Sequence, residues 1–226
     1  MRMEGTEAQH REELIRVNRI VAEQGLSRSS DGNISLRLDS ERLLITPSGC
    51  HKLSLRVEDL LVVDFAGQVC SGAPGLQPTS ELKMHLEVYR QRPDVRAVLH
   101  AHPPYATALT LVGLPFPGDF LPEASIGLGP VPTAAYATPG STDLAESIRP
   151  HIQKQDVLLL DHHGSLCVGR TLEETLIALE RLEHVAYTFY LACALGEPIP
   201  LPPEELERLR QSPPSVELVE TRRPRR

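Results

Sequence analysis

The sequence contains no tryptophan, and aromatic residues make up only 4% of its 226 positions. Proteins that bind single-stranded nucleic acid stack the bases on aromatic side chains, so this scarcity argues against that class. The net charge of −7 argues in the same direction, because surfaces that bind nucleic acid are basic. We therefore expect no nucleic-acid partner.

Cysteine and long apolar runs are also scarce. The four cysteines form no Cys-x-x-Cys pair, which excludes a dense disulfide framework. No apolar stretch approaches the roughly 20 residues that a transmembrane helix needs. Residues 1–13 are charged throughout, unlike a secretory signal. We expect a cytoplasmic protein that makes no membrane contact.

The pattern of apolar residues predicts helices interleaved with short strands. The predicted helices span 7–24, 81–91, 103–111, 142–151, 171–195 and 203–211. The predicted strands span 34–38, 43–46, 60–65, 95–101, 131–135, 157–160 and 166–168, and 114–130 is expected to be irregular. This order predicts one α/β domain with a mixed sheet over 1–226, with a disordered tail from about 212.

Four separated residues indicate one metal site: Glu81, His100, His102 and His163. His100 and His102 end a predicted strand, where residues i and i+2 point to the same face, so their imidazoles converge. Three neutral imidazoles and one carboxylate suit Zn²⁺ or a similar first-row metal. We expect one such ion per chain.

Neighbouring residues leave alternatives open at this site. Without the histidines, Glu81 would be interpreted as an acid that stabilises the first turn of a helix. His85 lies one turn further on, and we favour a role in packing or in supporting the ligands over direct ligation. His162 and His163 are adjacent and point oppositely, so one would bind the metal and the other would pack or face solvent.

Three polar turns are suited to a phosphate group. They offer backbone N–H groups or hydroxyls, and the last one stands at a predicted helix N-terminus. The candidate residues are Asn33, Ser48, Gly49, Thr79 and Ser80. Taken alone, each is better interpreted as an ordinary turn or cap, and the chain has no lysine-bearing P-loop.

Taken in order, the motifs resemble those of the class II aldolase/adducin family. The matching segments are Gly32-Asn33-Ile34-Ser35, Ile45-Thr46-Pro47-Ser48-Gly49, Pro78-Thr79-Ser80-Glu81, His100-Ala101-His102, Tyr136-Ala137-Thr138-Pro139-Gly140-Ser141 and His162-His163-Gly164. Any one of them is a weak signal, but six in order at the family's spacing over residues 32 to 164 are a strong one.

The resemblance implies a three-layer α/β/α sandwich around a central mixed, mainly antiparallel sheet. It implies zinc bound by Glu81, His100, His102 and His163. It also implies a sugar phosphate held by the five residues of the polar turns, and a homotetramer with active sites between subunits.

The chain differs from the family's aldolases at the position where they carry a tyrosine that acts as a proton donor. Spacing back from Tyr136 places that position near Leu121, and the nearest group able to move a proton is Glu123. The aldolases also have a tyrosine in the C-terminal tail, and this chain has none after Tyr190. We therefore take Glu123, reaching a neighbour's site, as the candidate for the remaining proton transfer.

The expected reaction is retro-aldol cleavage of a phosphorylated, fuculose-phosphate-like ketose through a metal-stabilised enediolate. Glu81 would be a ligand in the free enzyme and a base once substrate displaces it. A dehydratase or decarboxylase of a phosphorylated sugar or sugar acid could use the same site, and Glu123 in place of tyrosine leans toward these. A non-enzymatic module like the adducin head is the third reading, although such domains lack the metal ligands that this chain has.

Overall fold

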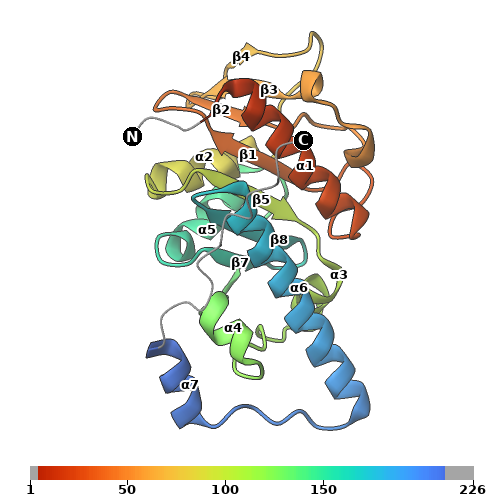
Figure 1. Cartoon of the computed structure of the whole chain (residues 1–226), viewed down its shortest axis with the longest axis vertical. Helices are drawn as coiled ribbons and strands as arrows, with labels where there is room; N and C mark the ends of the chain where they lie inside the picture. Colours follow the sequence, from red (N-terminus) through yellow and green to blue (C-terminus); the bar gives the residue numbers. More distant parts are fainter. Residues whose placement is uncertain (1–4, 212–226) are drawn as a thin grey trace, which may run out of the picture.

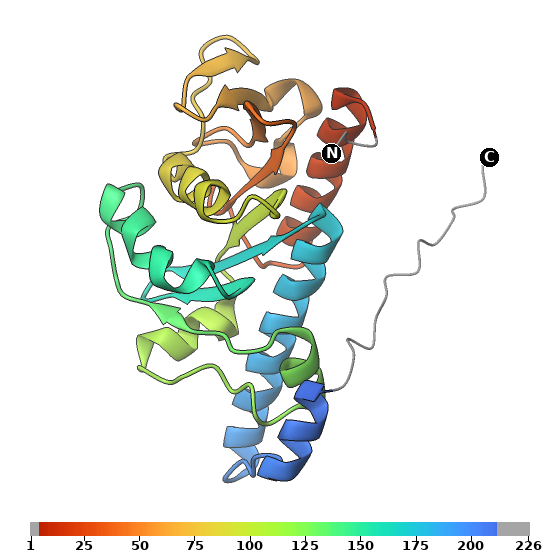
Figure 2. The ribbon, with the colours of Figure 1, turned by 90° about the vertical axis from the view of Figure 1, so that its left-hand side faces the viewer.

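The computed structural model describes residues 5–211, and within them the chain forms an eight-stranded sheet with helices on both faces (Figures 1 and 2). The strand order is β4-β3-β2-β1-β5-β8-β7-β6, and only the β6–β7 pair is parallel. The strands are β1 (Asn33–Arg37), β2 (Arg42–Ile45), β3 (Leu61–Asp64), β4 (Val69–Ser71), β5 (Ala97–Ala101), β6 (Thr133–Ala134), β7 (Val157–Leu160) and β8 (Gly164–Gly169). The expected mixed, mainly antiparallel sheet is confirmed.

Two apolar cores, one on each face of the sheet, make the fold a three-layer sandwich. The helices are α1 (Glu7–Glu23), α2 (Leu82–Gln91), α3 (Pro104–Leu111), α4 (Pro122–Gly127), α5 (Thr142–Ile152), α6 (Leu172–Leu195) and α7 (Pro203–Gln211), with short 3₁₀ turns η1 (Lys52–Ser54) and η2 (Val57–Asp59). On one face α1, α3 and α6 bury residues such as Leu14 and Leu179. On the other, α2 and α5 bury Met84 and Ile148.

Strand β5 lies at the centre of the sheet and is buried along its whole length. It runs antiparallel to both neighbours, so its N–H and C=O groups are paired on either side. Its side chains alternate between the two cores, with Leu99 facing the α1/α6 side and Val98 the α2/α5 side. His100 therefore points toward the layer that contains α2.

The helix boundaries follow the expected chemistry. Thr6, Ser141 and Thr171 accept hydrogen bonds from the first turns of α1, α5 and α6, as N-caps do. The residues that the sequence analysis assigned to the tail from about 212 lie outside the described part of the chain. Among residues 5–211, no helix combines the length and apolar character that a membrane crossing requires.

Besides the short turns η1 and η2, one helix and one strand were absent from the sequence prediction. The segment 114–130, expected to be irregular, contains α4, a helix of six residues that begins with Pro122 at its first position. Strand β4 was not predicted, because all three of its residues are exposed and it carries no apolar alternation.

Candidate metal centre

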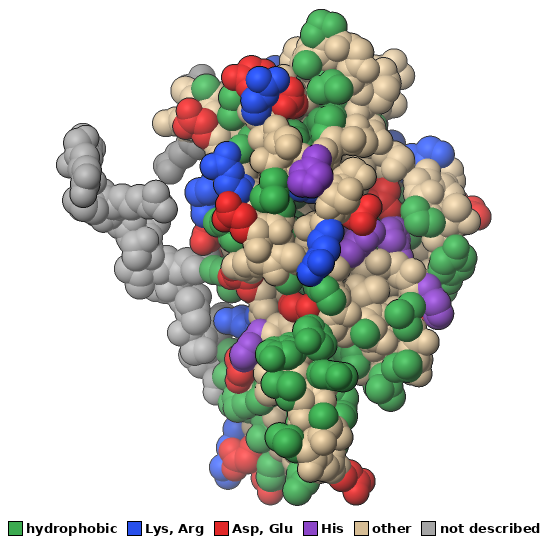
Figure 3. Space-filling model, turned by 90° about the vertical axis from the view of Figure 1, so that its right-hand side faces the viewer, with side chains coloured by type: hydrophobic (Ala, Val, Ile, Leu, Met, Phe, Trp, Pro, Cys, Tyr) green, Lys and Arg blue, Asp and Glu red, His purple; other side chains and the backbone are tan. Residues whose placement is uncertain are grey.

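Glu81, His100, His102 and His163 come together from three parts of the fold. His100 and His102 lie at the end of β5, Glu81 directly precedes α2, and His163 lies between β7 and β8. The centroids of the three imidazole rings are 4.7 to 5.0 Å apart. Their candidate ligand atoms all lie within 4.8 Å of one another. Figure 3 shows a group of histidine side chains near the middle of one face of the molecule.

Two close backbone contacts fix the end of β5. At Gly32, with φ of +73°, a Cβ atom would lie 2.8 Å from the carbonyl oxygen of His100. At Gly164 a Cβ atom would lie 2.4 Å from the carbonyl oxygen of Ala101 and 2.8 Å from the His102 ring. Only glycine fits at either position, so the turns on both sides can close against the histidine-bearing strand.

The donor atoms fit a cation. His100 donates its Nδ1–H to the carbonyl oxygen of Ser165 at 2.8 Å, which leaves the lone pair of its Nε2 for a ligand. That Nε2 is 3.0 Å from His102 Nε2 and 3.0 Å from Glu81 Oε2. Glu81 Oε1 lies 3.2 Å from His163 Nε2 and, although fully buried, has no hydrogen-bond partner. Nitrogen lone pairs and an orphaned carboxylate oxygen that face one point are the arrangement of a metal site.

The electrostatics favour the forms of these groups that bind a metal. Burial lowers the pKa of His102 to about 3 and that of His163 to about 4, so both imidazoles are neutral at pH 7. Burial acts to raise the pKa of Glu81, but His100 and the Asn33 amide outweigh it and hold that pKa below its ordinary value. The result is three imidazoles beside one carboxylate.

Of the two adjacent histidines, His163 is a candidate metal ligand and His162 lies at the surface. The side chain of His163 is 8% exposed and faces Glu81. His162 adopts a left-handed backbone with φ of 54°, and its half-exposed ring lies 2.9 Å from Asp161.

Two of the three polar turns lie side by side next to Glu81. Pro47 bridges to Pro78, Ser48 donates its N–H to Gln77, and Thr79 donates its N–H to Thr46. Ser48, Gly49 and Ser80 are exposed, whereas Thr79 is buried and accepts the N–H of Glu81. The turns that carry Ser48 and Thr79 thus form one polar surface beside the histidine cluster.

Asn33 is engaged differently from the other phosphate candidates. Its amide nitrogen donates to Glu81 Oε2 at 2.8 Å, and its amide oxygen is 2.5 Å from His85 Nε2. Both ends of this buried side chain therefore hold Glu81 and His85. The assignment of Asn33 to phosphate stays a prediction, and the structure adds a supporting role for it.

His85 supports the cluster without joining it. It is fully buried, and its Nδ1 is 2.6 Å from Ser35 Oγ, which in turn is 2.8 Å from Tyr89 Oη. Packing or support is the role that the sequence favours for His85. Its link to Ser35 and Tyr89 could not be predicted, because only the packing of β1 against α2 brings these residues together.

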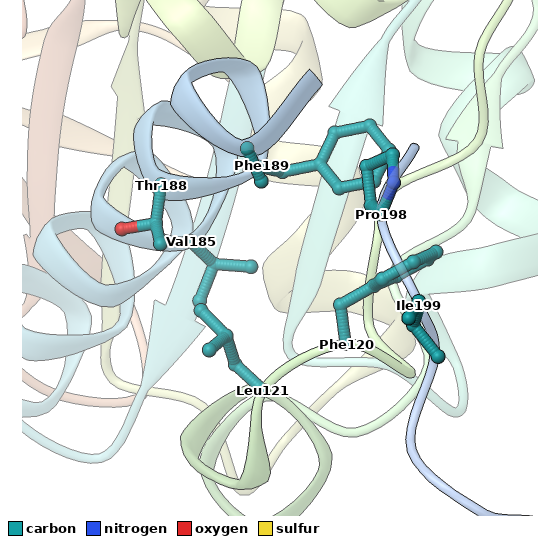
Figure 4. Close-up of a pocket in the computed structure, with 8 residues that line it drawn as sticks. Phe120, Leu121, Val185, Thr188, Phe189, Pro198 and Ile199 are labelled. Atoms are coloured by element: carbon teal, nitrogen blue, oxygen red, sulfur yellow. The ribbon is translucent and has the colours of Figure 1, made fainter. Parts of the chain in front are cut away.

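Glu123 lies apart from these groups in this single chain. It is exposed in the first turn of α4 and, within residues 5–211, makes no hydrogen bond or ion pair. Leu121, near which the family's tyrosine was expected, lines an apolar pocket with Phe120, Val185 and Phe189 (Figure 4). That pocket shares no residue with the histidine cluster.

Comparison with known proteins identifies the family. The profile of the Class II Aldolase and Adducin N-terminal domain matches residues 12–190. A 5-methylthioribulose-1-phosphate/5-deoxyribulose-1-phosphate aldolase from Rhodospirillum rubrum is 33% identical over 207 residues, 92% of each chain. An L-fuculose phosphate aldolase from Methanococcus vannielii is 38% identical over 174 residues, which are 77% of this chain and 92% of that protein.

The solved structures agree with the sequence matches. The structure of an L-fuculose 1-phosphate aldolase superposes with a TM-score of 0.81 at 32% identity, covering 92% of this chain and 97% of the other. The fold and the family that the motifs predicted are both confirmed. The protein is an enzyme of the lyase type, and it belongs to the class II aldolase and adducin N-terminal domain family.

Proposed function

We propose that the protein cleaves a ketose 1-phosphate by a metal-dependent retro-aldol reaction. The observation that carries this proposal is the convergence of three imidazoles and the Glu81 carboxylate beside the polar surface of Ser48 and Thr79. A metal site next to an anion-binding surface suits a substrate that carries both a phosphate and chelating oxygens.

The names of the relatives narrow the substrate class. They describe aldolases for 5-methylthioribulose 1-phosphate, 5-deoxyribulose 1-phosphate and L-fuculose phosphate. These sugars share a keto group next to the phosphorylated carbon and a terminal carbon without a hydroxyl. We infer a substrate of this class, with a fuculose-phosphate-like ketose among the candidates.

Zn²⁺ is the proposed metal, held by His100, His102, His163 and Glu81. Three neutral nitrogen donors and one carboxylate match its preferences, and another first-row divalent ion could occupy the same set. When bound, such a metal acts as a Lewis acid that stabilises the negative charge of an enediolate.

The chain's own residues supply binding and proton transfer. In the cleavage, the bond between C3 and C4 breaks, its electron pair stays on C3, and the C4 hydroxyl loses its proton to leave an aldehyde. The phosphate is assigned to Asn33, Ser48, Gly49, Thr79 and Ser80. Glu81 is the candidate to take or return a proton at the reacting carbon, and Glu123 from a neighbouring subunit is the candidate for the other transfer.

Product identification tests this function. Purified protein would be incubated with 5-deoxyribulose 1-phosphate, L-fuculose 1-phosphate and phosphorylated sugar acids, and the products would be separated by mass spectrometry. We expect dihydroxyacetone phosphate and an aldehyde in equal amounts from a ketose 1-phosphate. Release of CO₂ from a sugar acid, or of water from the ketose, would instead establish a decarboxylase or a dehydratase at this site.

A further inference from the structure

The turn that carries His163 is held by a side chain from another element. It consists of Asp161, His162 and His163, between the paired ends of β7 and β8. The N–H groups of Asp161 and His163 donate to backbone carbonyl oxygens at 3.1 and 3.0 Å. The N–H group of His162 instead donates to Thr110 Oγ1 on α3, at 3.1 Å. Thr110 is therefore the side chain that anchors the middle of this turn.

Thr110 is itself fixed in the interior. Only 2% of its surface is exposed, and its hydroxyl donates to the carbonyl oxygen of Thr107, one turn earlier in α3, at 2.8 Å. Because the hydroxyl proton is used there, the oxygen keeps its lone pairs for the N–H of His162. Helix α3 packs against β7 and β8 and begins two residues after His102. One helix thus follows one candidate ligand directly and holds the turn of another.

The backbone of His162 needs such an anchor. Its φ of 54° is left-handed, a conformation that is unfavourable for a residue with a Cβ atom. Residues of this kind keep the conformation only where their surroundings fix it, and they cluster at functional sites. A relaxed, right-handed His162 would redirect the chain just before His163, whose Nε2 lies 3.2 Å from Glu81 Oε1. The direction of the His163 ring therefore depends on how firmly His162 is held.

The His163 ring lacks the support that metal-binding histidines usually have. Such a ring is normally oriented by a hydrogen bond at the nitrogen that does not face the metal. His100 has this bond, from its Nδ1 to the carbonyl oxygen of Ser165 at 2.8 Å. The Nδ1 of His163 is buried and, within residues 5–211, has no hydrogen-bond partner. The orientation of His163 must therefore come from its backbone, and so from the turn that Thr110 anchors.

We propose that Thr110 is a positioning residue for His163: its hydroxyl oxygen holds His162 in the left-handed conformation that directs the His163 imidazole at Glu81. This inference rests on the proposed function for the presence of a metal in the cluster. It predicts that a neutral hydroxyl on α3 sets the affinity of the metal site, which can be measured without any turnover.

Zn²⁺ binding to chelator-treated protein is the first test, measured by competition with a coloured chelator. Thr110→Val keeps the shape of the side chain without the hydroxyl, and we expect its Zn²⁺ Kd to rise about 10-fold. Thr110→Ser restores the hydroxyl and should restore the wild-type Kd. Thr107→Val is the matched control on the same helix, because the buried hydroxyl oxygen of Thr107 has no hydrogen-bond partner within residues 5–211. Its Kd should equal that of wild type.

Two spectroscopic readouts separate positioning from a general effect on stability. In metal-free protein, the His162 amide should exchange its hydrogen at least about fivefold faster in Thr110→Val than in wild type, because an ordinary hydrogen bond is lost. The visible absorption bands of the Co²⁺-loaded variant should also shift, because one imidazole is displaced. Thr110→Ala provides the same comparisons if the Val variant does not fold. A role in stability alone would lower the melting temperature and leave the Kd and the Co²⁺ bands unchanged.

Two results would overturn the assignment. One is wild-type Zn²⁺ affinity in Thr110→Val and Thr110→Ala, and the other is an equal loss of affinity in Thr110→Ser or Thr107→Val. If wild type binds metal and cleaves a ketose phosphate but the Thr110 variants bind metal equally well, the function stands and the positioning role fails. If wild type binds no metal, the proposed function fails. The His162 exchange rate and the NMR shifts of the His163 ring, expected to change only in Thr110→Val and Thr110→Ala, then decide the positioning role alone.

Discussion

At the residue scale, Glu81 is held by a chain of hydrogen bonds that leads away from the three candidate ligand histidines. This chain passes through Asn33 and His85. Because the Asn33 amide nitrogen donates to Glu81, its oxygen must accept from His85 Nε2–H. Neutral His85 then accepts at Nδ1 from the Ser35 hydroxyl, and Ser35 Oγ lies 2.8 Å from Tyr89 Oη, which is also 3.2 Å from the carbonyl oxygen of Arg96. The tautomer of His85 with its proton on Nε2 therefore fits both of its contacts, to Asn33 and to Ser35.

Glu81→Gln separates ligand and base functions. The substitution keeps an oxygen ligand but removes the charge, so we expect the three histidines to retain most of the metal. We expect kcat to fall by roughly 10²-fold or more, since general acid–base groups contribute about 10²- to 10⁴-fold. His102→Ala should instead lose metal, because one convergent imidazole is removed. Elemental analysis and kinetics of both variants test this, and full activity in Glu81→Gln would contradict the base assignment.

His85 should make stability sensitive to acid. Burial, with a smaller contribution from His100, lowers its pKa from 6.5 to about 3. Between pH 6.5 and about 3 the unfolded chain binds a proton that the folded chain refuses, so stability falls as pH falls through this window. One such group contributes a slope of up to about 1.4 kcal/mol per pH unit.

Urea unfolding at pH 7 and pH 5 checks this prediction. The loss of stability between the two pH values should be smaller in His85→Gln than in wild type, because glutamine does not titrate. His151→Gln, at the partly exposed end of α5, is the control and should keep the wild-type loss. Equal losses in wild type and His85→Gln would show that His85 does not contribute.

The grouping of the candidate metal ligands could be predicted from sequence because the spacing of two of them follows strand geometry, whereas the residues that support them could not. His100 lies in β5 and His102 directly follows its end, so their i, i+2 spacing is local information. Ser35 and Tyr89 reach His85 only through packing between β1 and α2.

At the element scale, α3 is fixed by a carboxylate from another helix. Glu183 on α6 accepts the backbone N–H groups of Tyr105 and Ala106 at 2.9 to 3.1 Å. These are first-turn donors that α3 cannot satisfy itself, because its N-cap is Pro103. The same turn follows His102 directly, so α6 helps to hold the end of the histidine strand.

Glu183→Ala should therefore destabilise the protein. Hydrogen bonds to a charged group contribute about 1.5–3 kcal/mol, and we expect the free energy of unfolding to fall by about that amount. Glu12→Ala on the exposed face of α1 is the control, with a change within about 0.5 kcal/mol. Urea unfolding measures both, and a Glu183→Ala value equal to the control's would show that the capping bonds are dispensable.

The helices and strands with a clear repeat of apolar residues were predicted, and those without such a repeat were not. α6 has an apolar pattern over 24 residues and a threonine cap, so its bounds were nearly correct. α4 has only six residues, from Pro122 to Gly127, which are too few to show a repeating helical pattern. β4 pairs with β3 across a bulge and has no buried residue, so nothing in its composition distinguished it.

At the scale of the whole molecule, large apolar side chains are exposed on the C-terminal half of α6. They include Tyr190 at 57%, Leu191 at 41% and Leu195 at 91% exposed, and hydrophobic side chains gather on the lower part of the face in Figure 3. Such patches mark interaction surfaces. This is consistent with the homotetramer that the family resemblance implies, which stays a prediction.

Mixing of variants tests both the assembly and Glu123. We expect light scattering to give four times the mass of one chain. Glu123→Gln should retain its metal and lose turnover, as should Glu81→Gln. If Glu123 serves a neighbour's site, co-expressed Glu81→Gln and Glu123→Gln chains should regain part of the activity in mixed tetramers. An active monomer, or wild-type turnover in Glu123→Gln, would end the candidacy of Glu123.

The most direct measurement is the cleavage rate of a ketose 1-phosphate as metal is returned to chelator-treated protein. We predict no release of dihydroxyacetone phosphate without metal, and activity that rises linearly with Zn²⁺ to a plateau at one ion per chain. His102→Ala should show neither the binding nor the recovery. Undiminished cleavage by protein shown to be metal-free, or recovery in the His102→Ala variant equal to wild type, would contradict the assignment of this site.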